Sequence, residues 1–246
     1  MSSNTASCQT LSTLGLLLLV AGQLMPQMDF SIVNVALEPI SLSLHASQQQ
    51  LGLIISLYGL AFAVFLALSG RLGDKYGRKK VFLTGIALFA IASFFCGLAS
   101  SIYLLILARI AQGIAAALLM PQILATIHVT LKDARHARAI GIYGSVGGLS
   151  FVVGQALGGW LVTANVWGLG WRSVFYINLP VCLAILWAGR KYIPETKEQN
   201  HFSFDGKGTL LLAGIITLIL AVMTFGSDWR WQWPVWGLCV LIAPLI

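Results

Sequence analysis

Residues 70–80 of the chain read Gly-Arg-Leu-Gly-Asp-Lys-Tyr-Gly-Arg-Lys-Lys and stand between two apolar segments. The glycines of this stretch, which predict a tight turn between two helix ends, are Gly70, Gly73 and Gly77. Asp74 is suited to cap a helix or to pair with a nearby arginine, while Arg78 and Lys79 favour the cytoplasmic side of a membrane. A plain basic loop explains the Lys and Arg residues, but it does not explain the spacing Gly-x-Leu-x-Asp-x-x-Gly-Arg.

The composition around this turn excludes most classes of soluble protein. Of the 246 residues, 58% are hydrophobic and only 9% are charged, and the mean hydropathy is +0.85. Because a soluble domain carries about 25% charged residues, the chain is predicted to be a multi-pass membrane protein with lipid as its solvent. The net charge of +7 does not indicate nucleic-acid binding, since the basic residues lie between apolar stretches and form no continuous surface.

Apolar segments long enough to span a bilayer predict an all-α polytopic helix bundle. The expected helices cover residues 14–37, 51–68, 81–98, 102–127, 139–163, 173–189 and 208–225. A last stretch, 231–246, is about one turn too short to span comfortably. No Lys or Arg precedes the first apolar run, so we interpret it as an uncleaved membrane helix rather than a signal peptide.

The most polar connection divides the chain into expected domains. Residues 1–190 are predicted to form a six-helix bundle, residues 191–207 a cytoplasmic linker, and residues 208–246 additional membrane helices of which the last is incomplete. The six helices can also be read as two triplets, although the triplets share no clear sequence identity.

The distribution of basic residues predicts the orientation of the chain. Twelve Lys and Arg residues follow the second, fourth and sixth predicted helices, whereas only Arg172 and Arg230 lie in the loops on the other side. Tryptophans gather at that other side, as in an interfacial aromatic belt; they are Trp167, Trp171, Trp229, Trp231 and Trp233. The pattern predicts a multi-pass protein of the cell membrane with a cytoplasmic N-terminus.

Two charged residues, Asp29 and Arg109, fall inside predicted membrane helices. Each costs about 2.5–3.5 kcal/mol at the bilayer centre on insertion scales, so a compensating interaction is expected. At about 1.5 Å per residue, Asp29 lies roughly 22 Å from the inner face and Arg109 roughly 19 Å, in a core about 30 Å thick. We expect the two side chains to face one aqueous cavity and to couple proton entry to a conformational change. A static structural pair, or an Asp solvated near the outer interface, is the alternative.

Further polar and small residues at membrane depth are candidates for lining a cavity; they are Gln27, Asn34, Gln112 and Gly113. The alternative is that they only pack or bond across helices. The fifth helix carries glycines at helical spacing, and we expect a packing and bending surface that includes Gly154, Gln155, Gly158 and Gly159. The scattered Cys and His residues predict no metal site and no disulfide framework.

Three other motifs complete the pattern of the 70–80 stretch. They are Leu105-x-x-x-Arg109-x-x-Gln112-Gly113, Asp29 followed by Val33-Asn34-Val35-Ala36-Leu37, and Trp171-Arg172 followed by Phe175, Asn178 and Pro180. Together these motifs resemble the major facilitator superfamily, and within it the drug:proton antiporters with fourteen membrane helices. The resemblance is close over about residues 27–180.

Two motifs depart from the pattern of that family. Glu38 stands before Pro39, where the family places proline directly after Ala-Leu. The antiporter motif reads Gly-x-x-x-Gly-Pro-x-x-Gly-Gly, whereas this chain has Ser150 at the first glycine and Gln155 at the proline. In the family that proline shapes the helix for exchange, so its absence leaves symport open beside antiport.

The resemblance implies proton-driven efflux of small amphipathic compounds by alternating access, with the proton gradient as energy source, no cofactor and no enzymatic activity. Asp29 and Arg109 would couple protons, and the cytoplasmic gate would consist of Gly70, Asp74, Gly77, Arg78 and Lys79. The expected partners are substrate, protons and membrane lipid, with no nucleic acid. Because the family encloses its path between two six-helix halves, a missing C-terminal half or a partner chain is also expected.

Two alternatives to drug efflux stay open at this point. One is a proton-coupled symporter or a metabolite exporter of the same superfamily. The other is a transport-incompetent fragment, because the chain contains one six-helix half and the start of the linker helices.

Overall fold

The computed structural model describes residues 10–197 together with residues 208, 211, 214, 215 and 218. These residues contain six helical segments that are long and apolar enough to cross a membrane, and no strand. The predicted all-α bundle is therefore confirmed. The predicted helix over 208–225 lies outside the described residues except for the five positions named above, which are helical, and 231–246 lies wholly outside them.

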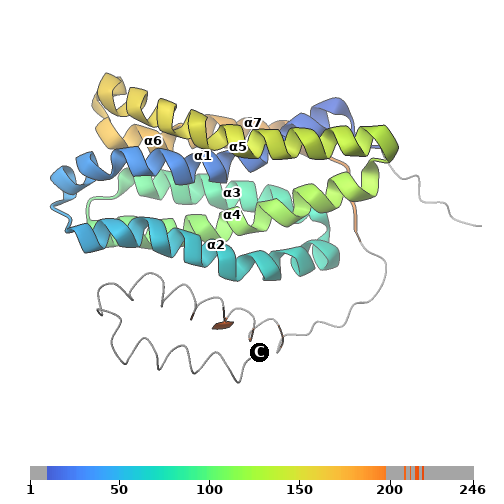
Figure 1. Ribbon diagram of the computed structural model, residues 1–246, viewed down its shortest axis with the longest axis horizontal. Coiled ribbons are helices and arrows are strands. Elements are labelled where there is room, and N and C mark those ends of the chain that lie inside the picture. The colour runs from blue at the N-terminus through green and yellow to red at the C-terminus, as the bar shows by residue number, and fades with distance from the viewer. Residues whose placement is uncertain (1–9, 198–207, 209–210, 212–213, 216–217, 219–246) are drawn as a thin grey trace, which may run out of the picture.

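The long helices run back and forth across the bundle and are joined by short connections (Figure 1). In chain order they are α1 (Thr13–Leu44), α2 (Gln48–Tyr76), α3 (Arg78–Leu98), α4 (Ile102–Thr130), α5 (Asp133–Ala164), the 3₁₀ turns η1 (Val166–Gly168) and η2 (Gly170–Arg172), α6 (Ser173–Tyr176) and α7 (Asn178–Tyr192). Helix α4 packs against α2 and α3, whereas α1 packs against α5 and α7, and α3 against α7.

Most helices are longer than the apolar pattern predicts. Helix α1 continues past residue 37 to Leu44, and α5 begins at Asp133 rather than at residue 139. Hydropathy marks only the part of a helix that suits lipid, whereas local capping sets its ends. Ser12 caps α1 by accepting a hydrogen bond from the Gly15 amide, and Ser47 and Gln50 form a reciprocal capping box on α2.

The predicted loop around residues 70–80 is shorter than its three glycines suggest. Gly70, Gly73 and Asp74 lie inside α2, and Arg78 already begins α3, so the connection between the helices is Gly77 alone. Gly73 serves packing instead of turning, because a Cβ there would collide with the Gln122 side chain of α4. The prediction of a three-glycine turn is thus wrong in extent.

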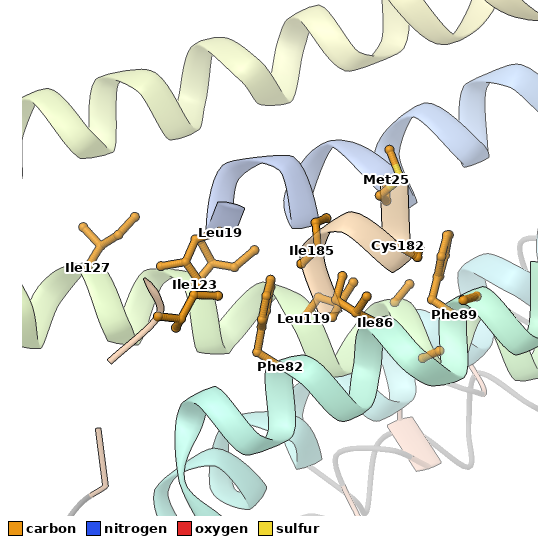
Figure 2. Packing of buried hydrophobic residues seen from close by; sticks show 14 of the residues in the cluster. Leu19, Met25, Phe82, Ile86, Phe89, Leu119, Ile123, Ile127, Cys182 and Ile185 are labelled. Carbon is orange, nitrogen blue, oxygen red and sulfur yellow. The ribbon is translucent and has the colours of Figure 1, made fainter. Parts of the chain in front are cut away.

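Apolar side chains form two clusters along the bundle. Figure 2 shows the first cluster, in which Phe82, Ile86 and Phe89 of α3 lie beside Leu119 and Ile123 of α4. The second cluster lies toward the other ends of the same helices; it includes Ile32, Val33, Ala36, Leu105, Ile106, Val174 and Phe175. Because lipid is as apolar as these side chains, close packing rather than exclusion from water holds them together.

Two glycines of α5 allow that helix to approach α1 closely. A Cβ at Gly154 would lie 2.7 Å from the Met28 carbonyl oxygen, and one at Gly158 would lie 2.9 Å from Ile32 Cγ1. The prediction of a packing surface holds at these two positions. For the other two it stays a prediction, because Gln155 is exposed and a Cβ at Gly159 would meet no described heavy atom within 4 Å.

Adjacent glycines therefore provide a matched test of the α1–α5 contact. We expect Gly158→Ala to lower the free energy of unfolding by about 1–3 kcal/mol, the range for overpacking a tight contact. Gly159→Ala should be neutral or mildly stabilising, because it only restricts the unfolded backbone. Thermal unfolding of both purified variants in detergent measures the difference; equal midpoints would contradict the described contact.

Candidate functional site

The two charges inside the membrane helices meet in the interior of the bundle. Arg109 Nη1 of α4 donates to Asp29 Oδ2 of α1, and both side chains have 0% of their surface exposed. The two side chains thus meet, as the depth estimate led us to expect. They face no aqueous cavity among the described residues, which enclose both groups completely, so the contact has the form of the structural pair given above as the alternative.

The carboxylate of Asp29 accepts two further hydrogen bonds at its other oxygen. Gln112 Nε2 of α4 donates to Asp29 Oδ1 at 2.8 Å, and Asn178 Nδ2 of α7 donates to the same atom at 2.9 Å. The carboxylate thereby receives three donors from two helices besides its own. All three partners are donors, which matches the acceptor-only character of a carboxylate.

A serine on α3 links the two amides to each other. Ser93 Oγ accepts from Gln112 Nε2 at 2.9 Å and from Asn178 Nδ2 at 3.4 Å. Gln112 Oε1 in turn accepts from Arg109 Nη1 at 2.7 Å. We name the set Asp29, Ser93, Arg109, Gln112 and Asn178 the polar layer; each of its members is fully buried.

Helix α2 holds the guanidinium of Arg109 from the remaining side. Arg109 Nε donates to the Ile54 carbonyl oxygen at 3.4 Å, and the guanidinium carbon lies 4.0 Å from the centre of the Tyr58 ring. Tyr58 donates its hydroxyl proton to the Pro26 carbonyl oxygen at 3.1 Å. A cation over an aromatic face gains electrostatic attraction that is strongest where water is excluded.

A glycine beside Gln112 permits this contact between α4 and α2. A Cβ at Gly113 would collide with the Tyr58 carbonyl oxygen and would lie 3.2 Å from the Ala61 Cβ. Gly113 therefore acts in helix packing and does not line a cavity as predicted. Any larger residue there would push α2 away from Arg109.

The polar layer separates the two apolar clusters along α1, α3 and α4. On α1, Asp29 lies between Met28 of the first cluster and Ile32 of the second. On α3, Ser93 lies between Ala90 and Cys96 in the same way. Apolar side chains therefore cover the polar layer on both sides, which lowers the local dielectric and strengthens its interactions.

The three other residues predicted to line a cavity, Gln27, Asn34 and Gln112, lie in different surroundings. Gln112 belongs to the polar layer, whereas Gln27 is half-buried on α1. Asn34 is exposed and donates to the Phe30 carbonyl oxygen at 2.9 Å, one turn earlier on its own helix. The structure thus brings together only one of the four predicted lining residues with Asp29.

The buried pair should show strong energetic coupling. Asp29→Asn or Arg109→Met alone leaves a polar or charged group without its partner, which costs about 3–5 kcal/mol when the partner is buried. We expect the double variant to be destabilised by clearly less than the sum of the single variants. Unfolding free energies from detergent titration, followed by tryptophan fluorescence, complete the cycle; additive losses would contradict a direct interaction.

At the end of the bundle where α2 meets α3, Gly77 turns the chain with a φ of +102°. Only glycine adopts this conformation without strain. Arg78 Nη2 pairs with Asp74 Oδ1 across the turn at 2.8 Å; the Arg78 side chain is 8% exposed and that of Asp74 41%. The predicted pairing of Asp74 with a nearby arginine is confirmed, whereas a gating role for Lys79 stays a prediction.

Glu195 and Thr196, which follow α7, accept hydrogen bonds from backbone amides at the start of α3. Glu195 Oε1 accepts the Lys79 backbone amide at 3.1 Å, and the Arg78 amide donates to the Thr196 carbonyl oxygen at 3.0 Å. Lys79 Nζ donates to the Arg190 carbonyl oxygen at 2.7 Å. Gly77 itself supplies no side-chain cap to α3, so the Glu195 carboxylate serves as a cap from a distant part of the sequence.

Loss of this cap should loosen the first turn of α3. We expect Glu195→Ala to cost about 1 kcal/mol locally, which corresponds to about fivefold faster hydrogen exchange at the amides of residues 78–81. Exchange followed by mass spectrometry measures the effect. Glu38→Ala, which removes an exposed glutamate of α1, is the matched control, and equal exchange in the two variants would contradict the cap.

Comparison with known protein families finds one match over residues 19–243, which is more than half of the chain. The chain belongs to the Major Facilitator Superfamily. The resemblance of its motifs to that superfamily is thereby confirmed. Membership of the Major Facilitator Superfamily places the chain among transporters rather than among enzymes, and its six apolar helices make it a multi-pass membrane protein.

Several relatives within the Major Facilitator Superfamily are named as transporters or resistance proteins. The probable actinorhodin transporter of Streptomyces coelicolor is 36% identical over 225 residues, which are 92% of this chain and 39% of the relative. The multidrug resistance protein Stp of Mycobacterium tuberculosis is 38% identical over 211 residues, 85% of this chain and 38% of the relative. The chain thus spans less than half of the length of these relatives.

A solved structure shares the fold of the chain. The inward-facing, unoccupied crystal structure of a bacterial homolog of the human lysosomal transporter Spinster gives a TM-score of 0.62 at 24% identity. The match covers 88% of this chain and 55% of that one. It therefore supports the helix arrangement of the Major Facilitator Superfamily in this chain.

Sequence reasoning missed several members of the site. Asn178 stands in a motif without an assigned role, and nothing in the sequence marks Ser93 or Tyr58. Uncharged polar side chains are common within predicted spans. Residue type alone therefore does not distinguish a side chain that bonds to the site from one that has no role in it. Only the depth of Asn178 relative to Asp29 would have connected the two.

Proposed function

We propose that the chain contributes the proton-coupling half of an exporter, which uses proton entry to drive small amphipathic compounds out of the cell. The observation that carries the proposal is the ion pair of Asp29 and Arg109 within the polar layer. Asp29 is the single carboxylate among the buried residues of the described range. An ionisable residue within the membrane is a default candidate for proton transfer.

Protonation of Asp29 would change the contacts between three helices. A neutral carboxyl group loses the charge attraction that holds Arg109 of α4 against α1, and its second oxygen is held by Gln112 and Asn178. The proton therefore favours any arrangement of α1, α4 and α7 that needs this attraction less. A ligand shifts such an equilibrium by its difference in affinity for the two arrangements.

Full burial of Asp29 supports coupling rather than leakage. With 0% of its surface exposed, the carboxylate exchanges protons with water only when the surrounding helices move. A transporter needs this gating, because a carboxylate open to both sides would pass protons without substrate. The turn around Gly77, with its Asp74–Arg78 pair, would hold the cytoplasmic side in one of the two arrangements; Gly70 and Lys79 would take part in this gate.

The class of substrate rests on the names of the relatives. The actinorhodin transporter and the multidrug resistance protein Stp support a substrate that is small and amphipathic. Helix α5 runs without interruption from Asp133 to Ala164 and carries Gln155 where the antiporter motif has proline. This observation favours symport, or export of a metabolite, as the second candidate.

The setting of the proposed transporter follows the charge pattern. The chain would lie in the cell membrane with a cytoplasmic N-terminus, would use the proton gradient and would need no cofactor. In the apolar stretch of α5 only 11% of the residues are buried, and in that of α2 only 22%. The corresponding share for α4 is 67%. These open faces support the proposal that a further protein segment, in addition to lipid, packs against α2 and α5.

Proton movement in vesicles tests the proposal. The purified chain is reconstituted, together with the second half that the proposal requires, in lipid vesicles that contain a pH indicator, and a cationic dye such as ethidium is added. We expect dye-dependent proton movement in the wild type and in Asp133→Asn, whose aspartate is exposed at the start of α5. Asp29→Asn should abolish it, because its side chain cannot carry a titrating proton.

Two outcomes would overturn parts of the proposal. Undiminished proton movement in Asp29→Asn would remove Asp29 from the mechanism. If the wild-type chain folds and inserts but moves neither dye nor protons even with the second half present, the chain is the transport-incompetent fragment given above as an alternative.

A further inference from the structure

The side chain of Asn178 is bonded on one side of its amide only. Its Nδ2 atom donates to Asp29 Oδ1 at 2.9 Å and to Ser93 Oγ at 3.4 Å. Its Oδ1 atom is buried and has no hydrogen-bond partner among the described residues. A buried acceptor without a partner costs free energy, so its retention next to a titratable group needs an explanation.

Charge on Asp29 explains the orientation of this amide. A carboxylate only accepts hydrogen bonds, so the nitrogen of Asn178 must face it. Both side-chain partners of Asp29 Oδ1, Gln112 Nε2 and Asn178 Nδ2, are donors. The arrangement therefore matches an oxygen that accepts and does not donate.

A proton on Asp29 Oδ1 would require an acceptor in place of one of these donors. Gln112 cannot supply it by rotation, because its Oε1 accepts from Arg109 Nη1 at 2.7 Å and its Nε2 donates to Ser93 at 2.9 Å. Asn178 can supply it, because a half-turn of its amide loses no bond at Oδ1. After that half-turn the oxygen faces both Asp29 and the Ser93 hydroxyl, which can then donate to it.

We infer that Asn178 is a positioning residue whose amide presents its nitrogen to the charged Asp29 and its oxygen to the protonated Asp29. This inference rests on the proposed proton coupling and extends it to α7. The proton moves from water to Asp29 Oδ1, and the amide of Asn178 neither gains nor loses one. The other ionisable groups near Asp29 are Arg109 of α4, Tyr58 of α2, Cys96 of α3 and Cys182 of α7.

The place of Asn178 in the fold links this rotation to the backbone. Asn178 is the first residue of α7, directly after Ile177, at which α6 and α7 are joined. Because the backbone at Ile177 is itself helical and Gly170–Tyr192 forms one span, a change of bonding here acts on that whole span. Protonation would thus be transmitted to α7 as well as to the Asp29–Arg109 contact.

Infrared difference spectroscopy tests the inference directly on the whole chain. The protein is labelled with ¹³C at the side-chain carbonyl of asparagine, reconstituted in lipid vesicles and measured between alkaline and acidic pH. The band of protonated Asp29 is the one that is absent in Asp29→Asn. The band of Asn178 is the one that is absent in Asn178→Leu, or in Asn178→Ser if the leucine variant does not fold, and that persists in Asn34→Leu.

We expect the Asn178 carbonyl band to shift to lower wavenumber in step with the appearance of protonated Asp29, because the oxygen gains two donors. In Asp29→Asn the band should not move with pH. Appearance of protonated Asp29 without a shift of the Asn178 band would overturn the inference and leave the proposed function intact. If no Asp29 band appears down to acidic pH, the inference and the proton-coupling proposal both fail.

Discussion

One buried ion pair determines how the helices of this bundle can be arranged. Asp29 and Arg109 are both fully enclosed, and neither can lose the other without leaving an uncompensated group in a low-dielectric interior. The pair joins α1 to α4, bonds directly to α2 and α7, and is linked to α3 through Gln112 and Ser93, so the positions of five helices depend on it. A change in the charge of a single carboxyl group therefore affects the whole bundle.

The surrounding apolar packing makes this dependence strict. The two apolar clusters lie on either side of the polar layer and exclude the water that would otherwise replace a lost partner. Close helix contacts at Gly113 and Gly154 keep α2 and α5 against the same region. Packing and polar bonding thus support one arrangement, whose stability can be altered by protonation at one site.

The sequence predicted the helices and the pairing but not the closure of the site. Hydropathy located six membrane helices, and the rise per residue placed Asp29 and Arg109 at one depth, because both follow from regular helix geometry. Which face of a helix meets which neighbour does not follow from one apolar helix, so Asn178 and Ser93 were missed. The cap from Glu195 was also invisible, because it joins segments more than a hundred residues apart in the chain.

The most direct measurement of this account is the distance between the Asp29 carboxyl carbon and the Arg109 guanidinium nitrogens in a lipid bilayer. Dipolar recoupling in solid-state NMR, with ¹³C-labelled aspartate and ¹⁵N-labelled arginine, reports it, and Asp29→Asn identifies the signal. The account predicts an ion-pair separation of less than about 4 Å at neutral pH. A dipolar coupling too weak to detect in the folded protein would show that the two charges do not meet, and the polar layer would then not hold the bundle together.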